Sequence, residues 1–163
     1  NHQLCSLTPD ESFAAAFLGI YDAQSRELSY VNCGHSPLPR VVSAEGEAAI
    51  ATLSEGQAML LGIVEPRVFA PASVTLRRGD TLTLVTDGIP EAGGDVDELY
   101  GEERMDRTLA AGRAAAPAEL IQGLMADLRG FVDGSAPDDD LTVLAMRVNE
   151  PSGQIGQVDP GYR

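Results

Sequence analysis

Two acidic turns, far apart in the sequence, carry the residues best suited to do chemistry. The first is Asp87-Gly88, inside the segment TLTLVTDGIPE at residues 81–91. The second is the run Asp138–Asp140, which the apolar segment LTVLAMRV follows at once. Carboxylate oxygens are the ligands that hard divalent cations prefer, and adjacent acids repel one another unless a cation relieves them. We therefore expect Asp87 and Asp139 to meet at one ion site.

Both turns are expected to be carried by β-strands. Residues 81–86 alternate Thr with Leu and Val, a composition that favours extended backbone. Asp87-Gly88 then ends the strand, because Gly permits a tight turn and Asp tolerates one. Residues 141–148 are predicted to form the last strand of the chain. A rigid strand would thus hold each acidic turn in place.

The remaining elements are predicted from hydrophobic periodicity and turn residues. Residues 1–9 are interpreted as the end of a helix and a loop, and residues 48–64 as a loop with an apolar stretch. Further strands are expected at residues 12–22, 26–32, 38–43 and 67–76, with Pro71 placing the last at a sheet edge or a bulge. Helices are expected at residues 101–116 and from Pro117 to before Gly134. Strands followed by helices predict an α+β fold, an antiparallel β-sandwich flanked by helices.

The charge balance restricts the partners. The formal net charge is −14, and all 11 basic residues are arginine. Such a surface repels nucleic acid and anionic membranes, so we expect no nucleic-acid partner. The longest apolar runs are far shorter than a bilayer span, which predicts no membrane insertion. Neutral or basic proteins and metal ions are the partners that remain.

The length of 163 residues predicts a single domain. We place that domain at residues 1–148 and interpret residues 149–163, which are rich in Gly, Pro and Gln, as a flexible tail. Cys5 and Cys33 lack the spacing of a metal or redox site. They are interpreted as reduced thiols in a cytoplasmic protein; a disulfide between them is the alternative, which no spacing supports.

Three motifs in this order resemble the type 2C metal-dependent (PPM) serine/threonine phosphatases. They are VNCGHSPLP at 31–39, LVTDGIPEA at 84–92 and PDDDLTVLAMRV at 137–148. The similar branch is bacterial, that of the sporulation stage II protein E and of sigma-factor regulators. The phrases FAAAFLGIYD and LYGEERM also resemble this branch. The resemblance covers residues 1–148.

The resemblance implies a sandwich of two antiparallel sheets with helices outside and a site for two Mn²⁺ or Mg²⁺ ions. It implies hydrolysis of a phosphoserine or phosphothreonine by a metal-activated water. Asp87 and Asp139 would be the catalytic residues and metal ligands, and Gly88 would allow close backbone approach. His35, Glu91 and Asp140 are weaker candidates for this site. The alternatives to a role in the site are that His35 is a structural turn residue, that Glu91 is a carboxylate at the start of a helix, and that Asp140 is a solvated acid.

Two departures from the family pattern qualify this resemblance. The family has an upstream Asp-x-Ser-Gly-His-Gly-like segment whose aspartate bridges the two metals, and no such segment occurs in these 163 residues. We therefore expect the domain to be incomplete at its N-terminus. Classical members have Gly-Asp-Ser-Arg where this chain has Gly34-His35-Ser36-Pro37. His35 there could ligate a softer metal or bond locally.

The sequence is compatible with two functions. The first is a metal-dependent protein phosphatase domain in bacterial signalling, whose substrate would be a phosphorylated anti-sigma-factor antagonist. The alternative is a non-catalytic regulatory or interaction module on a degenerate phosphatase scaffold, which the missing aspartate motivates. Because an incomplete domain would expose apolar strand edges, we also expect this chain to associate, for instance as a homodimer.

Overall fold

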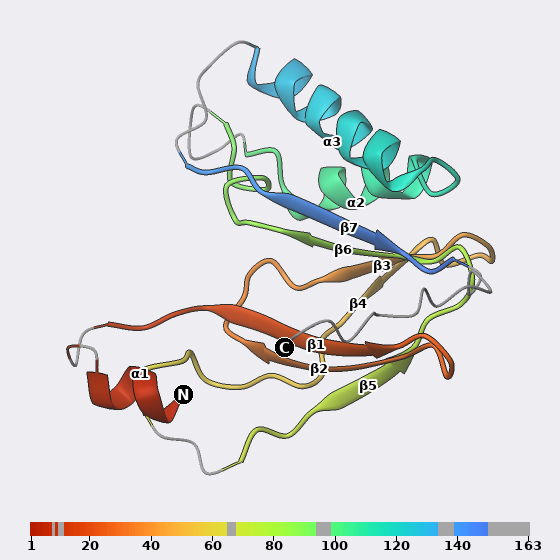
Figure 1. Ribbon diagram of the computed structural model, residues 1–163. Coiled ribbons are helices and arrows are strands. Elements are labelled where there is room, and N and C mark those ends of the chain that lie inside the picture. The colour runs from red at the N-terminus through yellow and green to blue at the C-terminus, as the bar shows by residue number, and fades with distance from the viewer. Residues whose placement is uncertain (8, 10–11, 65–67, 94–98, 134–138, 150–163) are drawn as a thin grey trace, which may run out of the picture.

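The computed structural model describes residues 1–7, 9, 12–64, 68–93, 99–133 and 139–149. Three helices and seven strands occur in this part of the chain (Figure 1). In chain order they are α1 (His2–Leu7), β1 (Ala16–Asp22), β2 (Glu27–Cys33), β3 (Arg40–Val42), β4 (Ile50–Thr52), β5 (Ala72–Thr75), β6 (Thr81–Val85), α2 (Glu102–Ala111), α3 (Pro117–Val132) and β7 (Val143–Arg147). None of these helices has the length and apolar character needed to span a bilayer.

The strands form two antiparallel sheets. The first has the order β1-β2-β5, and the second has the order β4-β3-β6-β7. In the second sheet β6 pairs with β3 on one side and with β7 on the other, from Thr81↔Arg147 to Val85↔Val143. Because β6 and β7 are antiparallel, the end of β6 lies beside the start of β7. The fold is therefore α+β, as the sequence predicts.

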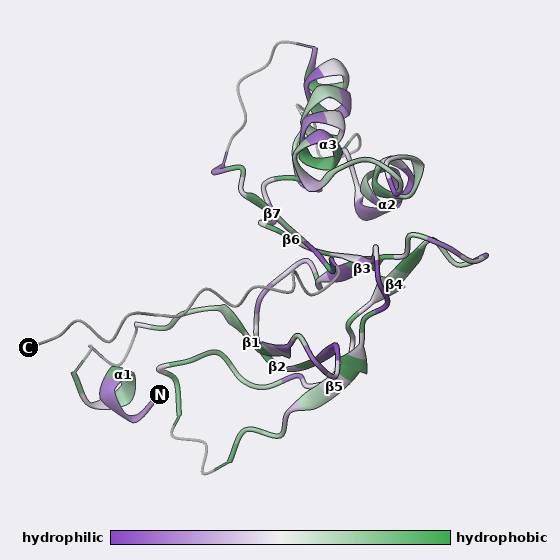
Figure 2. Ribbon diagram, turned by 45° about the vertical axis from the view of Figure 1, so that its right-hand side comes forward, coloured by the Kyte–Doolittle hydropathy of each residue, from purple (hydrophilic) through white to green (hydrophobic). Residues whose placement is uncertain are grey.

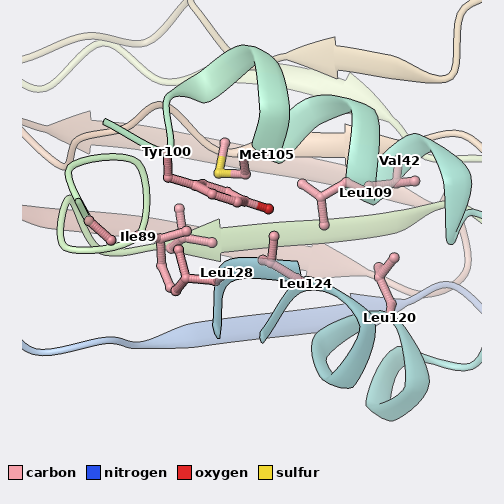
Figure 3. Packing of buried hydrophobic residues seen from close by; sticks show 10 residues of the cluster. Val42, Ile89, Tyr100, Met105, Leu109, Leu120, Leu124 and Leu128 are labelled. Atoms are coloured by element: carbon pink, nitrogen blue, oxygen red, sulfur yellow. The ribbon is translucent and has the colours of Figure 1, made fainter. Parts of the chain in front are cut away.

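The sheets and the helices α2 and α3 form three successive layers (Figure 1). One core cluster lies between the sheets and includes Leu28 and Tyr30 of β2 and Leu82 of β6. A second lies between the β4-β3-β6-β7 sheet and the two helices (Figure 3). The four-stranded sheet thus has apolar contacts on both faces. Its strands are held from two sides, which gives their ends fixed positions.

The helix α3 follows the predicted spacing. Leu120, Leu124 and Leu128 are buried on one face and point toward the α2 residues Met105 and Leu109 (Figure 3). Both helices also carry hydrophilic residues between their apolar ones, which Figure 2 shows as purple segments beside green ones. Apolar residues spaced by four lie one above another on a helix, so a single stripe covers the sheet.

An ion pair connects the two helices. Asp127 of α3 accepts hydrogen bonds from Nε and Nη2 of Arg104 in α2, at 2.8 and 2.9 Å. The Tyr100 hydroxyl donates a further bond of 2.8 Å to the same carboxylate. The Arg104 guanidinium also lies over the rings of Tyr100 and Phe131. The hydrogen bonds from Arg104 hold the pKa of Asp127 well below the ordinary value for aspartate.

Most of the expected elements are present, with shorter bounds. The strands β1, β3, β6 and β7 and the helix α3 lie within the predicted ranges, whereas β2 ends at Cys33, one residue beyond its predicted range. The prediction for residues 48–64 was wrong in part, because β4 occurs there and pairs with β3. The strand expected at 67–76 begins only at Ala72, after Pro71, and lies at the edge of its sheet. The helix expected at 101–116 ends at Ala111, beside Gly112.

The central leucine of α3 gives a test of this packing. Leu124 is fully buried between α3, α2 and the sheet. We expect Leu124→Ala to lower the free energy of unfolding by about 2–5 kcal/mol, since it removes buried methyl groups and leaves a cavity. Urea unfolding followed by circular dichroism measures this change. Gln122→Ala, on the exposed face of the same helix, should stay within about 0.5 kcal/mol of wild type. Equal losses for both variants would contradict the packing described.

The lowered pKa of Asp127 predicts a pH dependence. A carboxylate whose pKa is lower in the folded state stabilises the fold above its unfolded pKa of about 3.9. That contribution is lost as the pH falls through the folded pKa. We expect Asp127→Asn to lower the free energy of unfolding at pH 7, and the difference from wild type to shrink below about pH 4. Urea unfolding at several pH values measures both. A difference independent of pH would show that the charge of Asp127 does not matter.

Candidate functional site

The turn that contains Asp87 is fixed by its own backbone. It follows β6 directly and is closed by hydrogen bonds from Ile89 N to Thr86 O at 3.1 Å and from Glu91 N to Asp87 O at 3.0 Å. The amide of Gly88 donates to Oδ1 of Asp87 at 3.1 Å. The Asp87 side chain is exposed, while Ile89 anchors the turn in the helix-side core. One carboxylate is thus presented to solvent from a rigid support.

Thr86 joins this turn to the second acidic segment. Its hydroxyl donates to Asp140 O at 2.8 Å and accepts from Thr142 N at 2.9 Å. Its own amide donates to Thr142 O at 3.1 Å. The sequence pattern indicates Thr86 only as a residue that favours strand. The sequence does hold a signal for the role of Thr86, because it precedes Asp87 at a strand end, where a hydroxyl commonly forms hydrogen bonds with nearby backbone.

Gly88 lies where the two acidic segments touch. A Cβ atom built at Gly88 would be 2.9 Å from Asp140 O and 3.4 Å from the Cβ of Asp139. Any side chain at position 88 would therefore press against the opposite backbone. The structure brings the predicted residues Asp87, Gly88 and Asp139 together at one end of the four-stranded sheet, at the left in Figure 1.

The second acidic segment is described from Asp139 onward, and Asp138 lies outside the described residues. Asp139 and Asp140 are both exposed. Oδ1 of Asp139 accepts from the amide of Asp140 at 2.7 Å, the same arrangement that Asp87 makes with its following residue. In each aspartate one oxygen is therefore oriented by the chain, and the carboxylate stays accessible to solvent.

His35 belongs to a third turn, between β2 and β3. The buried Asn32 side chain accepts from His35 N at 2.7 Å and donates to His35 O at 3.0 Å, which fixes the turn. Burial lowers the pKa of His35, and the charge of Asp87 partly opposes that shift. Nε2 of His35 is buried and has no hydrogen-bond partner among the residues that the structure describes. The negative charge of Asp87 thus acts on this imidazole, although 52 positions separate the two residues.

Glu91 lies on the same turn as Asp87 and is exposed. Its amide closes that turn through the bond to Asp87 O, so its backbone has a structural part in the site. The α2 helix begins eleven residues later, at Glu102, and carries Glu102 and Glu103 in its first turn. The expected role of Glu91 as a helix-start carboxylate therefore does not apply to α2.

The ligand atoms of Asp87 and Asp139 show whether this site suits a metal ion. Asp87 and Asp139 offer carboxylate oxygens, which suit Mn²⁺ and Mg²⁺, and Gly88 allows their two segments to approach. The described part of the chain contains no cluster of three or more His, Cys, Asp or Glu able to hold an ion. The arrangement fits one side of a hard-cation site, and a full coordination shell needs further ligands.

Comparison with a family model places the chain in a known group. Residues 1–149 match the model of the stage II sporulation protein E (SpoIIE) family. The chain is also 31% identical over 137 residues to Protein IcfG from Synechocystis sp.. That match covers 84% of this chain and 21% of IcfG. The chain therefore spans about a fifth of the length of this relative.

Solved structures show the same fold. The PP2C domain of SiaA from Pseudomonas aeruginosa matches with a TM-score of 0.74 and 22% identity, over 90% of this chain and 56% of that one. The RsbU and RsbW domains of Rv1364c from Mycobacterium tuberculosis match with a TM-score of 0.70 and 27% identity, over 92% of this chain and 40% of that one. The two sheets and flanking helices are thus a PP2C-like fold, and the chain belongs to the SpoIIE family of PP2C-type phosphatase domains.

Proposed function

We propose that this chain is part of a metal-dependent protein serine/threonine phosphatase domain. The observation that carries the proposal is the contact between the Asp87-Gly88 turn and the Asp139 segment, at one end of a PP2C-like sheet. Membership of the SpoIIE family supports it. The alternative is a binding module without catalysis. It predicts that the intact protein does not hydrolyse phosphate esters in the presence of Mn²⁺.

Asp87 and Asp139 are the proposed metal ligands. A SpoIIE phosphatase domain from Bacillus subtilis was presoaked with Mn, and RsbX was solved in complex with magnesium. A pair of such ions lowers the pKa of a water and neutralises charge on a phosphoryl group. The described residues hold no cluster of three or more possible ligands, so the proposed site needs ligands besides Asp87 and Asp139.

The other residues of the site are given supporting roles. Thr86 holds the two acidic segments in register through its hydroxyl. Gly88 keeps the space between them free of side-chain atoms. The exposed carboxylates of Glu91 and Asp140 add negative potential near the ions. The charge of Asp87 acts on His35 from the neighbouring turn, and an imidazole nitrogen can form a hydrogen bond with a water or a phosphoryl oxygen.

The proposed substrate is a phosphoserine or phosphothreonine on an anti-sigma-factor antagonist. One relative of similar fold contains both RsbU and RsbW domains, which supports a protein substrate in a regulatory system of that kind. The net charge of −14 favours a partner with a neutral or basic contact surface. We propose the cytoplasm as the compartment of this domain, which its two free thiols, Cys5 and Cys33, support.

Neutralising either ligand tests the metal site. We expect Asp87→Asn and Asp139→Asn each to weaken Mn²⁺ binding by at least about 100-fold, since even residues that only support a ligand cost 10- to 100-fold. Hydrolysis of p-nitrophenyl phosphate and of a phosphoprotein should fall with it. The measurements are calorimetric titration with Mn²⁺ and initial rates on the intact protein.

Glu47→Gln is the matched control for these variants. Glu47 is an exposed acid in the turn after β3, and the predicted site lies at the opposite end of that strand. This variant removes one negative charge without touching the site. It should bind Mn²⁺ and hydrolyse substrate as the wild type does. Unchanged Mn²⁺ binding in Asp87→Asn would refute the metal site.

Gly88→Ala tests the close approach itself. The new methyl group would lie 2.9 Å from Asp140 O, so the two acidic segments must separate. We expect weaker Mn²⁺ affinity with both carboxylates still present. Gly130→Ala in α3 is the control, because its Cβ meets nothing within 4 Å, and it should stabilise the helix by up to about 1 kcal/mol. Calorimetry and urea unfolding compare them, and wild-type affinity in Gly88→Ala would argue against the contact.

A further inference from the structure

A buried arginine lies beneath the helix α2. The Arg40 side chain is only 5% exposed, although it starts the strand β3 in the four-stranded sheet. Its Nη2 pairs with Oε2 of Glu102, its Nε donates to Oδ1 of Asp106 at 3.1 Å, and its Nη1 donates to Leu38 O. A buried guanidinium is stable only when its charge and donors are satisfied, and here the first two turns of α2 supply both carboxylates.

The start of α2 is also tied to the turn that carries Asp87. The amide of Tyr100 donates to Ala92 O, and the amide of Gly101 donates to Pro90 O, both at 2.8 Å. These bonds come immediately before the first residue of α2 at Glu102. The end of the Asp87 turn and the beginning of α2 therefore form one hydrogen-bonded unit. A shift of α2 would pull on that turn.

On its other side, Arg40 is tied to the turn that carries His35. Its bond to Leu38 O holds the segment between His35 and β3, and the Asn32 side chain holds His35 itself. The hydroxyl of Thr83 in β6 donates to Arg40 O at 3.2 Å, so the backbone of Arg40 is fixed to the central strand as well. Arg40 thus contacts both the His35 segment and the helix that continues from the Asp87 turn.

We propose that Arg40 is a positioning residue that sets the Asp87 turn relative to the His35 turn, by clamping the start of α2 to the sheet. This inference rests on the proposed metal site and adds a residue that makes no contact with it. Glu102 is 54% exposed and Asp106 31% exposed, so without Arg40 the two acids would repel each other and turn to solvent. The first turn of α2 would then move away from the sheet, and the Asp87 turn would lose the support of its hydrogen bonds to Tyr100 and Gly101.

The test compares two arginines that form ion pairs involving α2. Arg40 pairs with two acids of α2, and Arg104 of α2 pairs with an acid of α3. Arg40→Lys keeps the charge but loses the planar fork that reaches three partners at once. Arg104→Lys is the matched control, because Arg104 binds Asp127 and connects α2 to α3 rather than to the sheet. Asp106→Asn weakens the same ion pair from the α2 side. If Arg40→Lys does not fold, Asp106→Asn is used in its place. All are made in the intact protein and unfolded in urea to record their stability.

Two measurements separate positioning from stability alone. We expect Arg40→Lys to weaken Mn²⁺ affinity about 10-fold, the lower range for residues that orient a metal ligand. In the metal-free protein it should speed hydrogen exchange at the amides of Glu91, Tyr100 and Gly101. Asp106→Asn should change both in the same direction. Arg104→Lys should lower stability but leave affinity and these exchange rates within about twofold of wild type.

The outcomes are distinct. If Arg40→Lys loses stability but binds Mn²⁺ like wild type with unchanged exchange at these three amides, Arg40 is merely structural and the inference fails. It fails too if Arg104→Lys changes both measurements as much as Arg40→Lys does. If the wild-type protein binds no Mn²⁺, the proposed function fails, and the exchange rates alone then decide whether Arg40 positions the Asp87 turn.

Discussion

The antiparallel pairing of β6 with β7 is the constraint on which the candidate site depends. It brings the last residue of one strand beside the first residue of the other, although 58 positions separate Val85 from Val143. At that shared end the Asp87 turn follows β6, and the Asp139 segment precedes β7. The position of Asp87 relative to Asp139 is therefore a consequence of sheet register. A slip of one residue would send alternate side chains to the wrong face and separate the two acids.

Holding two aspartates together in a protein of net charge −14 has an electrostatic cost, and the local backbone offsets part of it. Each carboxylate accepts a hydrogen bond from the amide of the next residue. These bonds orient one oxygen of each carboxylate. The Thr86 hydroxyl joins the two segments without adding charge. A cation between the aspartates would relieve the repulsion that remains, so the site gains more from an ion than from any neutral ligand.

The features that the sequence predicted are those with a local signal. Strand β6 has alternating Thr and Leu before an Asp-Gly turn, and α3 has leucines spaced by four after an early proline, so both elements were predicted, and for α3 the buried positions as well. Strand β4 has only three residues and no period of its own, and only pairing with β3 defines it. The roles of Thr86 and Arg40 depend on partners 54 to 66 positions away, which no local pattern encodes. The family resemblance predicts close backbone approach at Gly88, but neither the segment that approaches it nor the action of the Asp87 charge on His35.

The three-residue ion cluster under α2 also has a consequence for sequence change over time. Arg40 lies on a strand, whereas Glu102 and Asp106 lie four residues apart on a helix. Loss of the arginine alone leaves two acids without a partner, and loss of the acids alone leaves a buried cation without one. Drift at these positions must therefore be concerted. Related chains should carry either the whole triplet or an apolar residue at position 40 with uncharged residues at 102 and 106, and few intermediates between them.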